Sequence, residues 1–158
     1  MEKQTLKRIF EFLEEKENKL PKAKGTLIWK MTFNEPLIEE ELNVKGDLNL
    51  HNSKITSLPR GLKVGGYLNL FFKNITSLPE GLEVGGSLYL IGSKIKSLPK
   101  GLKVDGNLNL EHTNITSLPK GLEVGGLMRI GYTPLKKYTD EQIKEMVKPG
   151  FIKGKIVR

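Results

Sequence analysis

The chain has 158 residues, the size of one domain, and 37% of them are hydrophobic, which is enough to build a core. It has no cysteine, which excludes disulfides, thiolate metal sites and cysteine nucleophiles, and no run approaches the roughly 18 apolar residues of a membrane-spanning helix. The formal net charge is +8, from 26 Lys and Arg against 18 Asp and Glu. This balance is compatible with nucleic-acid or acidic protein partners, and equally with plain solubility.

Residues 1–37 are predicted to form an N-terminal cap. Thr5 to Asn18 carries Leu6, Ile9 and Leu13 at helical spacing, which predicts an amphipathic helix. The run Thr-Leu-Ile-Trp-Lys-Met-Thr-Phe at 26–33 is typical of a strand. The charged start has no apolar segment of the kind that signal peptides contain, so we expect a cytoplasmic protein.

Residues 38–138 contain a repeat with a period of 20 residues. The segment from Leu58 to Leu70 reads Leu-Pro-Arg-Gly-Leu-Lys-Val-Gly-Gly-Tyr-Leu-Asn-Leu. Close copies occupy 78–90, 98–110 and 118–130, and a weaker first copy with Glu39 in place of the proline occupies 38–50. A repeat of this length is the mark of a solenoid, in which each turn buries its apolar face against its neighbours.

Each copy predicts two short strands, because Leu-x-Leu and Leu-x-Val both alternate with the period of an extended chain. We therefore predict a mainly β solenoid of about five 20-residue turns, with parallel strands about 4.8 Å apart. Glycine recurs at one place in every copy, which indicates either a positive φ or close stacking of the backbone. Asp105 stands beside that place, where most copies have a second glycine, and we attribute it to the tolerance of aspartate for the left-handed region. The recurrent glycines are Gly46, Gly66, Gly86, Gly106 and Gly126.

Residues 139–158 are predicted to form a C-terminal cap within the same single domain. Thr139-Asp140-Glu141-Gln142 matches a capping box, and the helix that it opens should stop at Pro149-Gly150. Residues 151–157 are predicted to form one final strand that covers the last turn.

The pattern Leu-x-Leu-x-x-x-x-Ile-x-x-Leu-Pro resembles the short leucine-rich repeats of bacterial effector proteins. Its Gly-Leu-x-Val-x-Gly-x-Leu-x-Leu form is similar to small repeat proteins of bacteriophages and gut bacteria. The resemblance covers about residues 38–138 and implies a capped leucine-rich-repeat scaffold that binds other proteins. The usual asparagine after the strand is missing, and we expect a wider bend or an outward-turned Lys73 because a lysine is costly to bury there. The residues at that place are Ser53, Lys73, Ser93, Thr113 and Thr133.

No pattern in the chain indicates catalysis, a metal site or a bound cofactor. His51 and His112 lie three turns apart, so they should be too distant to share a metal ion. No Ser-His-Asp set falls within hydrogen-bond reach, and the glycine pairs lack the Gly-x-x-x-x-Gly-Lys-Ser/Thr of a phosphate loop. We therefore expect a protein that is not an enzyme and that uses no cofactor.

The outward positions of the Leu-x-Leu strands carry the most informative side chains. Aromatic and apolar residues on two adjacent turns should form an exposed patch with a polar rim, and such a patch favours a protein-binding site. The same residues can instead pack against each other as ordinary cross-strand pairs. The proposed anchors are Tyr67, Phe71, Tyr89 and Ile91, and the proposed polar contacts are Asn69, Asn109 and Arg129.

Three hypotheses for function remain open. The first is a protein-binding module, which by the resemblance could be a phage-type adaptor or an inhibitor of a host protein, and which would then act in the host cytoplasm. The second is a nucleic-acid or nucleotide binder, and the third is a protein that associates with itself through the same patch. The second would use a basic edge made of Lys54, Lys73, Lys94 and Lys96, which is predicted to lie beside the aromatic patch and not on it.

Overall fold

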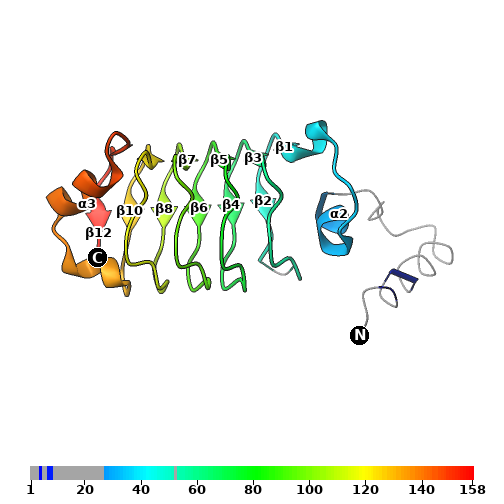
Figure 1. The fold of residues 1–158 in the computed structure, drawn as a ribbon, viewed down its shortest axis with the longest axis horizontal. Helices are drawn as coiled ribbons and strands as arrows, with labels where there is room; N and C mark the ends of the chain where they lie inside the picture. The colour runs from blue at the N-terminus through cyan, green and yellow to red at the C-terminus, as the bar shows by residue number, and fades with distance from the viewer. Residues whose placement is uncertain (1–3, 5–6, 9–26, 52) are drawn as a thin grey trace.

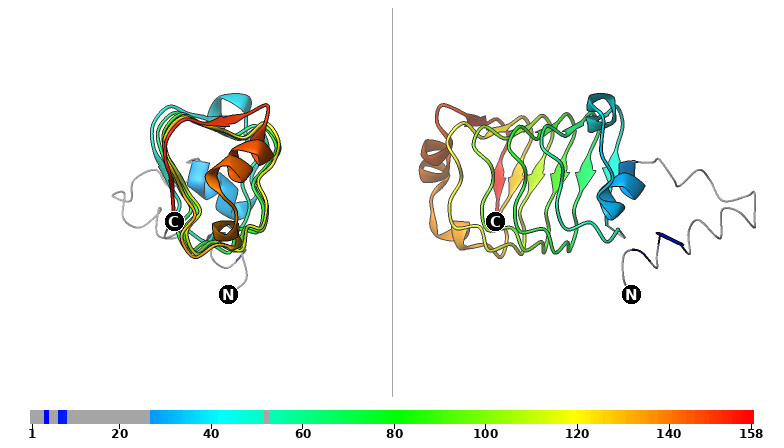
Figure 2. Two further views of the ribbon diagram at one scale, coloured as in Figure 1. Left: turned by 90° about the vertical axis from the view of Figure 1, so that its left-hand side faces the viewer. Right: turned by 45° about the vertical axis from the view of Figure 1, so that its right-hand side comes forward.

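The computed structural model describes residues 4, 7–8, 27–51 and 53–158. In this part of the chain the backbone winds into a β solenoid, with parallel strands stacked along its long axis (Figure 1). Seen down that axis, the successive turns superimpose as one coil (Figure 2). The predicted fold class, a capped solenoid of short parallel strands, is confirmed.

Two six-stranded parallel sheets form two sides of the coil. Sheet A comes from the Leu-x-Val segments: β1 (Asn43–Val44), β3 (Lys63–Val64), β5 (Glu83–Val84), β7 (Lys103–Val104), β9 (Glu123–Val124) and β11 (Phe151–Ile152). Sheet B comes from the Leu-x-Leu segments: β2 (Leu48–Asn49), β4 (Leu68–Asn69), β6 (Leu88–Tyr89), β8 (Leu108–Asn109), β10 (Met128–Arg129) and β12 (Ile156–Val157). Both strands of each repeat were therefore predicted.

The number of regular turns is about four, and the expected five is wrong. Leu48 pairs with Leu68, Leu68 with Leu88, Leu88 with Leu108 and Leu108 with Met128, so five strands of sheet B bound four complete turns of 20 residues. The first copy does not close a turn of its own. The short 3-10 helix η1 (Glu39–Leu42) stands where later copies have a Pro-x-Gly turn.

The core runs through the centre of the coil as columns of stacked side chains. The Leu-x-Leu, Leu-x-Val and isoleucine positions point inward, and Leu70, Leu90 and Leu110 have no exposed surface at all. A single turn could not shield these side chains, so the buried ladder is what makes the stack cohesive.

Two glycine columns shape the corners for different reasons. At Gly66, Gly86, Gly106 and Gly126 a Cβ would come within 3.0 Å of backbone atoms of the preceding turn, so close stacking excludes a side chain there. A positive φ, the other reason considered for this column, occurs instead at the turn glycines 61, 81, 101 and 121, whose φ values lie between 68° and 77°. Asp105 is not among the residues with positive φ, so the left-handed explanation for it is wrong.

The N-terminal cap differs from the prediction. Residues 27–33, expected as a strand, form the helix α2 (Leu27–Phe33). Leu27 and Met31, four residues apart, pack against the core, and the rings of Trp29 and Phe33 meet at 4.2 Å on another side of the helix. Contacts at this i, i+4 spacing override the β preference of a short apolar run. The helix predicted over 5–18 lies almost entirely outside the described residues.

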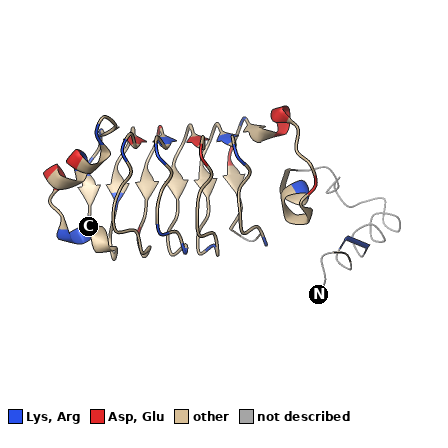
Figure 3. Ribbon diagram, viewed as in Figure 1, with Lys and Arg blue, Asp and Glu red and all other residues tan. Residues whose placement is uncertain are grey.

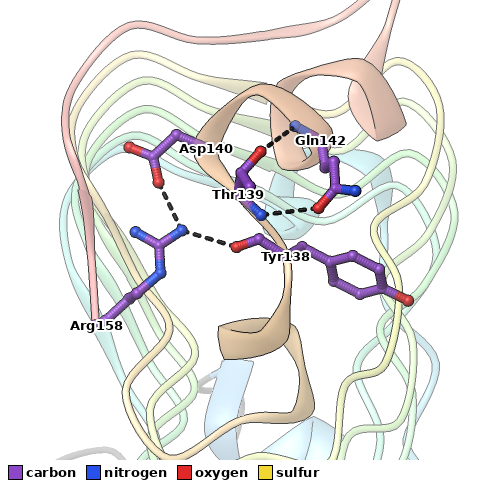
Figure 4. A network of polar contacts seen from close by, with 5 residues as sticks. All are labelled: Tyr138, Thr139, Asp140, Gln142 and Arg158. Atoms are coloured by element: carbon purple, nitrogen blue, oxygen red, sulfur yellow. Dashed lines mark hydrogen bonds and ion pairs between the residues drawn. The ribbon is translucent and has the colours of Figure 1, made fainter.

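The C-terminal cap opens with the 3-10 helix η2 (Pro134–Lys137) and continues with α3 (Asp140–Val147), whose predicted capping box is confirmed. Thr139 Oγ1 accepts from the Gln142 N–H at 3.2 Å, and Gln142 Oε1 accepts from the Thr139 N–H at 2.9 Å (Figure 4). Arg158 Nη2 lies 2.6 Å from Asp140 Oδ1 and donates to the Tyr138 carbonyl at 2.9 Å, which ties the last residue to the start of the helix.

The single strand predicted over 151–157 is wrong, because the segment forms two strands in different sheets. β11 pairs with β9 in sheet A, and β12 pairs with β10 in sheet B. Gly154 makes the corner between them, where a Cβ would lie 2.5 Å from the Gly126 carbonyl oxygen. Residues 151–156 thus occupy the same structural positions as residues 123–128 of the preceding copy. The equivalence is hard to recognise in the sequence, because Phe-Ile-Lys-Gly-Lys-Ile and Glu-Val-Gly-Gly-Leu-Met share only the glycine at the corner.

Candidate binding surfaces

The outward side of sheet B, here called the strand face, carries the predicted aromatic patch. Tyr67 and Tyr89 occupy neighbouring turns, and their rings meet edge to face with centroids 6.2 Å apart. Phe71 and Ile91 follow at the ends of the same strands, and all four side chains are half-buried. The structure therefore places the four predicted anchors on neighbouring turns, all of them half-buried, with the two tyrosine rings in contact.

The patch continues from the strand face into the bend that follows sheet B. The Phe71 ring lies 5.8 Å from the His51 ring and 4.6 Å from the Phe72 ring, both edge to face. Phe72 is 64% exposed. Rings held by their neighbours in this way lose little freedom when a partner covers them.

The asparagines of the strand face serve the backbone first. The Oδ1 atoms of Asn49, Asn69 and Asn109 accept from the N–H group two residues ahead, at 3.1, 3.0 and 2.9 Å. Asn109 also donates to Glu111 Oε2 at 3.0 Å and is only 7% exposed, so its predicted role as an open polar contact is wrong. Asn69 is half-buried, and Arg129 is exposed as predicted.

Replacing Asn109 by alanine should lower the free energy of unfolding by about 1–2 kcal/mol, because the Glu111 N–H loses its acceptor in a shielded place. The same change at Asn49, which makes the same bond in an exposed position, should cost clearly less. Urea unfolding of both variants measures the difference. Equal losses would show that burial does not decide the value of this bond.

A second polar column, which the sequence analysis missed, joins successive turns just before the strands of sheet B. Asp47 Oδ1 accepts from the Tyr67 N–H at 2.9 Å, and Asn107 Oδ1 accepts from the Leu127 N–H at 2.9 Å. Ser87 Oγ accepts from the Asn107 N–H at 3.1 Å in the same way. The 20-residue separation of each pair was the available signal, because short polar side chains recur there between glycine and leucine.

The predicted basic edge is only partly real. Lys54, Lys94 and Lys96 are exposed on the bends after sheet B, as expected. Lys73 neither turns outward nor lies on the edge: it is 7% exposed, and its Nζ donates to the Ser53 carbonyl of the preceding turn. Loss of hydration on burial lowers the pKa of the Lys73 ammonium. The inward column can hold its aliphatic stem, which the prediction overlooked.

Replacing Lys73 by threonine should stabilise the fold at neutral pH by about 1 kcal/mol, because it removes a cation that burial strips of water. Thr113 and Thr133 show that the column accepts a hydroxyl, which donates to the carbonyl three residues back at 2.7 Å. The pKa of Lys73 is lower in the folded protein than in the unfolded chain. At pH values between these two pKa values the unfolded chain binds more protons, so the free energy of unfolding should rise with pH. Thermal melts from pH 7 to about pH 10 measure this increase in stability. It should be absent in Lys73→Thr and present in the control Lys94→Thr, which replaces an exposed lysine.

An exposed row of aromatic residues in left-handed backbone was not predicted. Phe72, His112 and Tyr132 occupy the same place in their turns, with φ values of 49°, 57° and 56°. This region costs roughly 1–2 kcal/mol for a residue that has a Cβ atom. His112 and Tyr132 stack at 4.4 Å with their rings 9° from parallel, and Tyr132 is 74% exposed. Asn52 and Gly92 at the same place in other turns were the available signal for the left-handed backbone, because these residue types favour a positive φ.

In the described part of the chain, no three histidine or carboxylate side chains gather where they could hold a metal ion. No helix within those residues is long and apolar enough to cross a membrane. His51 and His112 contact aromatic rings, Phe71 and Tyr132 respectively.

Comparisons of the chain with protein-family models, with curated proteins and with solved structures find no match.

Proposed function

We propose that this protein is a non-catalytic docking module that binds a partner protein through the strand face. The observation that carries the proposal is the paired tyrosines, whose rings meet at 6.2 Å and keep part of their surface open to solvent. Tyrosine is a favoured anchor of protein interfaces because it offers a large amphipathic surface with few rotatable bonds. Phe71 and Ile91 extend the apolar centre, and Arg129 and Asn49 are the exposed polar residues of the same sheet.

The rigidity of the solenoid supports this use. Each strand of sheet B is hydrogen-bonded to its neighbours, and asparagine side chains fix the bends that follow β2, β4 and β8. A partner would therefore meet a preformed surface and would not have to order it. The similarity of the repeat to small repeat proteins of bacteriophages and gut bacteria extends the proposal to a phage-type adaptor or inhibitor acting on a host protein.

The test is affinity capture from a nuclease-treated lysate of the host or source cell, with native protein and Tyr67→Ala/Tyr89→Glu as baits. We expect at least one protein to be enriched by the native chain and lost with the double variant. The control, Phe151→Ala/Lys120→Glu, also removes aromatic surface and introduces a carboxylate, but in β11 and in the turn before β9, away from the strand face. It should retain the partner.

Circular dichroism must first show that both variants melt as folded proteins. A partner lost equally from both double variants, or no partner that depends on the tyrosines, would contradict docking on the strand face. Light scattering distinguishes partner binding from self-association. A native dimer that becomes a monomer in the tyrosine variant would assign the surface to self-association.

A further inference from the structure

The bends that follow sheet B present aromatic rings over several turns. The Phe72 ring lies across Gly92 of the next turn, so that a Cβ added to Gly92 would be only 2.2 Å from the Phe72 Cδ1. The Phe72 ring thereby covers the one turn of this row in which glycine replaces an aromatic residue. His112 and the Tyr132 ring stacked on it continue the row in the next two turns. Lys136 Nζ stands 5.6 Å from the Tyr132 centroid.

The same bends carry a concentrated positive charge. Residues 51–58 and their copies at 71–78, 91–98, 111–118 and 131–138 hold six lysines and a single carboxylate, Glu111. Five of the lysines are exposed, and within the described residues none of those five forms an ion pair. They are Lys54, Lys94, Lys96, Lys136 and Lys137.

The outward residues of sheet A provide the contrast. Lys63, Glu83, Lys103 and Glu123 alternate in sign from strand to strand, and Lys63 pairs with Glu83 at 3.4 Å. Red and blue segments accordingly alternate along the upper edge of the molecule (Figure 3). That side is nearly neutral, so the basic excess of the repeats is concentrated where the exposed rings are.

We infer that these bends, with Phe72, His112 and Tyr132 as stacking surfaces and the neighbouring lysines as phosphate contacts, bind single-stranded nucleic acid. Exposed rings interleaved with cations on one narrow surface suit unpaired bases, whose faces are free to stack. From residue 54 to residue 134 the solenoid rises by four steps of about 4.8 Å, or about 19 Å. That length fits roughly four nucleotides, the lower end of single-strand site sizes.

This site adjoins the proposed protein-docking surface, which it meets where the Phe72 ring contacts the Phe71 ring. Its other rings and its lysines lie in the bends, whereas the paired tyrosines Tyr67 and Tyr89 lie on the strand face. The sequence alone predicted the aromatic anchors and the basic residues on neighbouring but different surfaces. The left-handed row adds further exposed rings to the surface that carries the lysines.

The test is fluorescence anisotropy with a labelled oligothymidine of about 15 nucleotides titrated with the full chain. If four of the lysines contact phosphates, the logarithm of the association constant should fall with the logarithm of salt concentration with a slope of about −3. Lys94→Gln/Lys96→Gln should reduce that slope by about 1.4. Lys63→Gln/Lys103→Gln, which removes the same charge from sheet A, should leave the slope unchanged.

The rings are tested separately by Phe72→Asn and Tyr132→Asn. Asparagine tolerates the left-handed region, so these variants should fold at least as well as the native chain. Each should weaken binding about tenfold or more without altering the salt slope. Phe151→Asn, which removes an exposed ring from sheet A, should leave the affinity unchanged. Tyr67→Ala/Tyr89→Glu should still bind the oligonucleotide, which keeps this test independent of the docking proposal.

Three outcomes would overturn the inference: no binding at low salt, equal affinity for a duplex of the same length, or equal affinity for polyglutamate. Binding of polyglutamate would assign the bends to an acidic protein segment, and equal binding of the duplex would show a charge effect without stacking. Oligothymidine binding that depends on both the rings and the bend lysines supports the single-stranded site.

Discussion

Leu110→Ala should lower the free energy of unfolding by about 2–5 kcal/mol. Leu110 is fully buried in the middle of the leucine column, between Leu90 of the preceding turn and Ile130 of the following turn. Stacked turns are fixed at the strand spacing by their hydrogen bonds, so the neighbours cannot close over the space that the removed atoms leave. The variant should therefore lie toward the upper half of this range.

Urea unfolding followed by circular dichroism measures the loss, and Thr116→Ala is the control. Thr116 is exposed on the same turn, and its replacement should change stability by no more than about 0.5 kcal/mol. A loss at Leu110 as small as that at Thr116 would mean that the column is not the packed core. Because each turn contacts only its neighbours, the same variant should also broaden the transition as cooperativity between the two halves weakens.

Gly86→Ala should cost about 3 kcal/mol, the upper end of the usual range for overpacking. An added Cβ would lie 2.6 Å from the Gly66 carbonyl carbon and 2.8 Å from the Tyr67 nitrogen. These are main-chain atoms held in sheets on both sides of the corner, so relief requires the two turns to separate. Alanine would otherwise be favourable at a position with negative φ, because it reduces the entropy of the unfolded chain.

Gly46 is the matched control for this substitution. It occupies the same column in the first turn, where no turn precedes it, and a Cβ there meets nothing within 4 Å. Gly46→Ala should therefore be neutral or slightly stabilising. Thermal melts of the two single variants decide the matter, and a similar loss at both positions would attribute the cost to local conformation and not to stacking.

The repetitive part of the fold was predictable because each buried residue recurs every 20 positions. Leu68, Leu88 and Leu108 repeat one environment, so a pattern too short to interpret once becomes decisive when it is repeated. The caps offer no such repetition. Residues 27–33 contain enough apolar and β-branched side chains for either a strand or a helix, and the helix is the form in which Leu27 and Met31 both pack against the core.

The candidate sites were less predictable than the core because individual side chains depart from the repeat. The positions of Tyr67 and Tyr89 were foreseen, since alternation along a strand settles which side a residue faces. The burial of Lys73 was not foreseen, because the aliphatic stem of a lysine favours burial whereas its amine favours solvent. Only the structure shows a carbonyl within reach of the amine. Phe72 was not among the predicted anchors, although Asn52 and Gly92 in its column are residue types typical of the left-handed backbone that it adopts.

The alternating charges on sheet A have a consequence for how this chain can lengthen or shorten. Removing one turn would bring Lys63 beside Lys103, or Glu83 beside Glu123, and like charges directly opposite on neighbouring strands repel. Removing or adding two turns preserves the alternation. The structural unit of the stack is thus 20 residues, whereas the unit that can be duplicated or deleted without electrostatic conflict is a pair of turns. The same rule disfavours a folding error in which a strand skips one turn and pairs with the next.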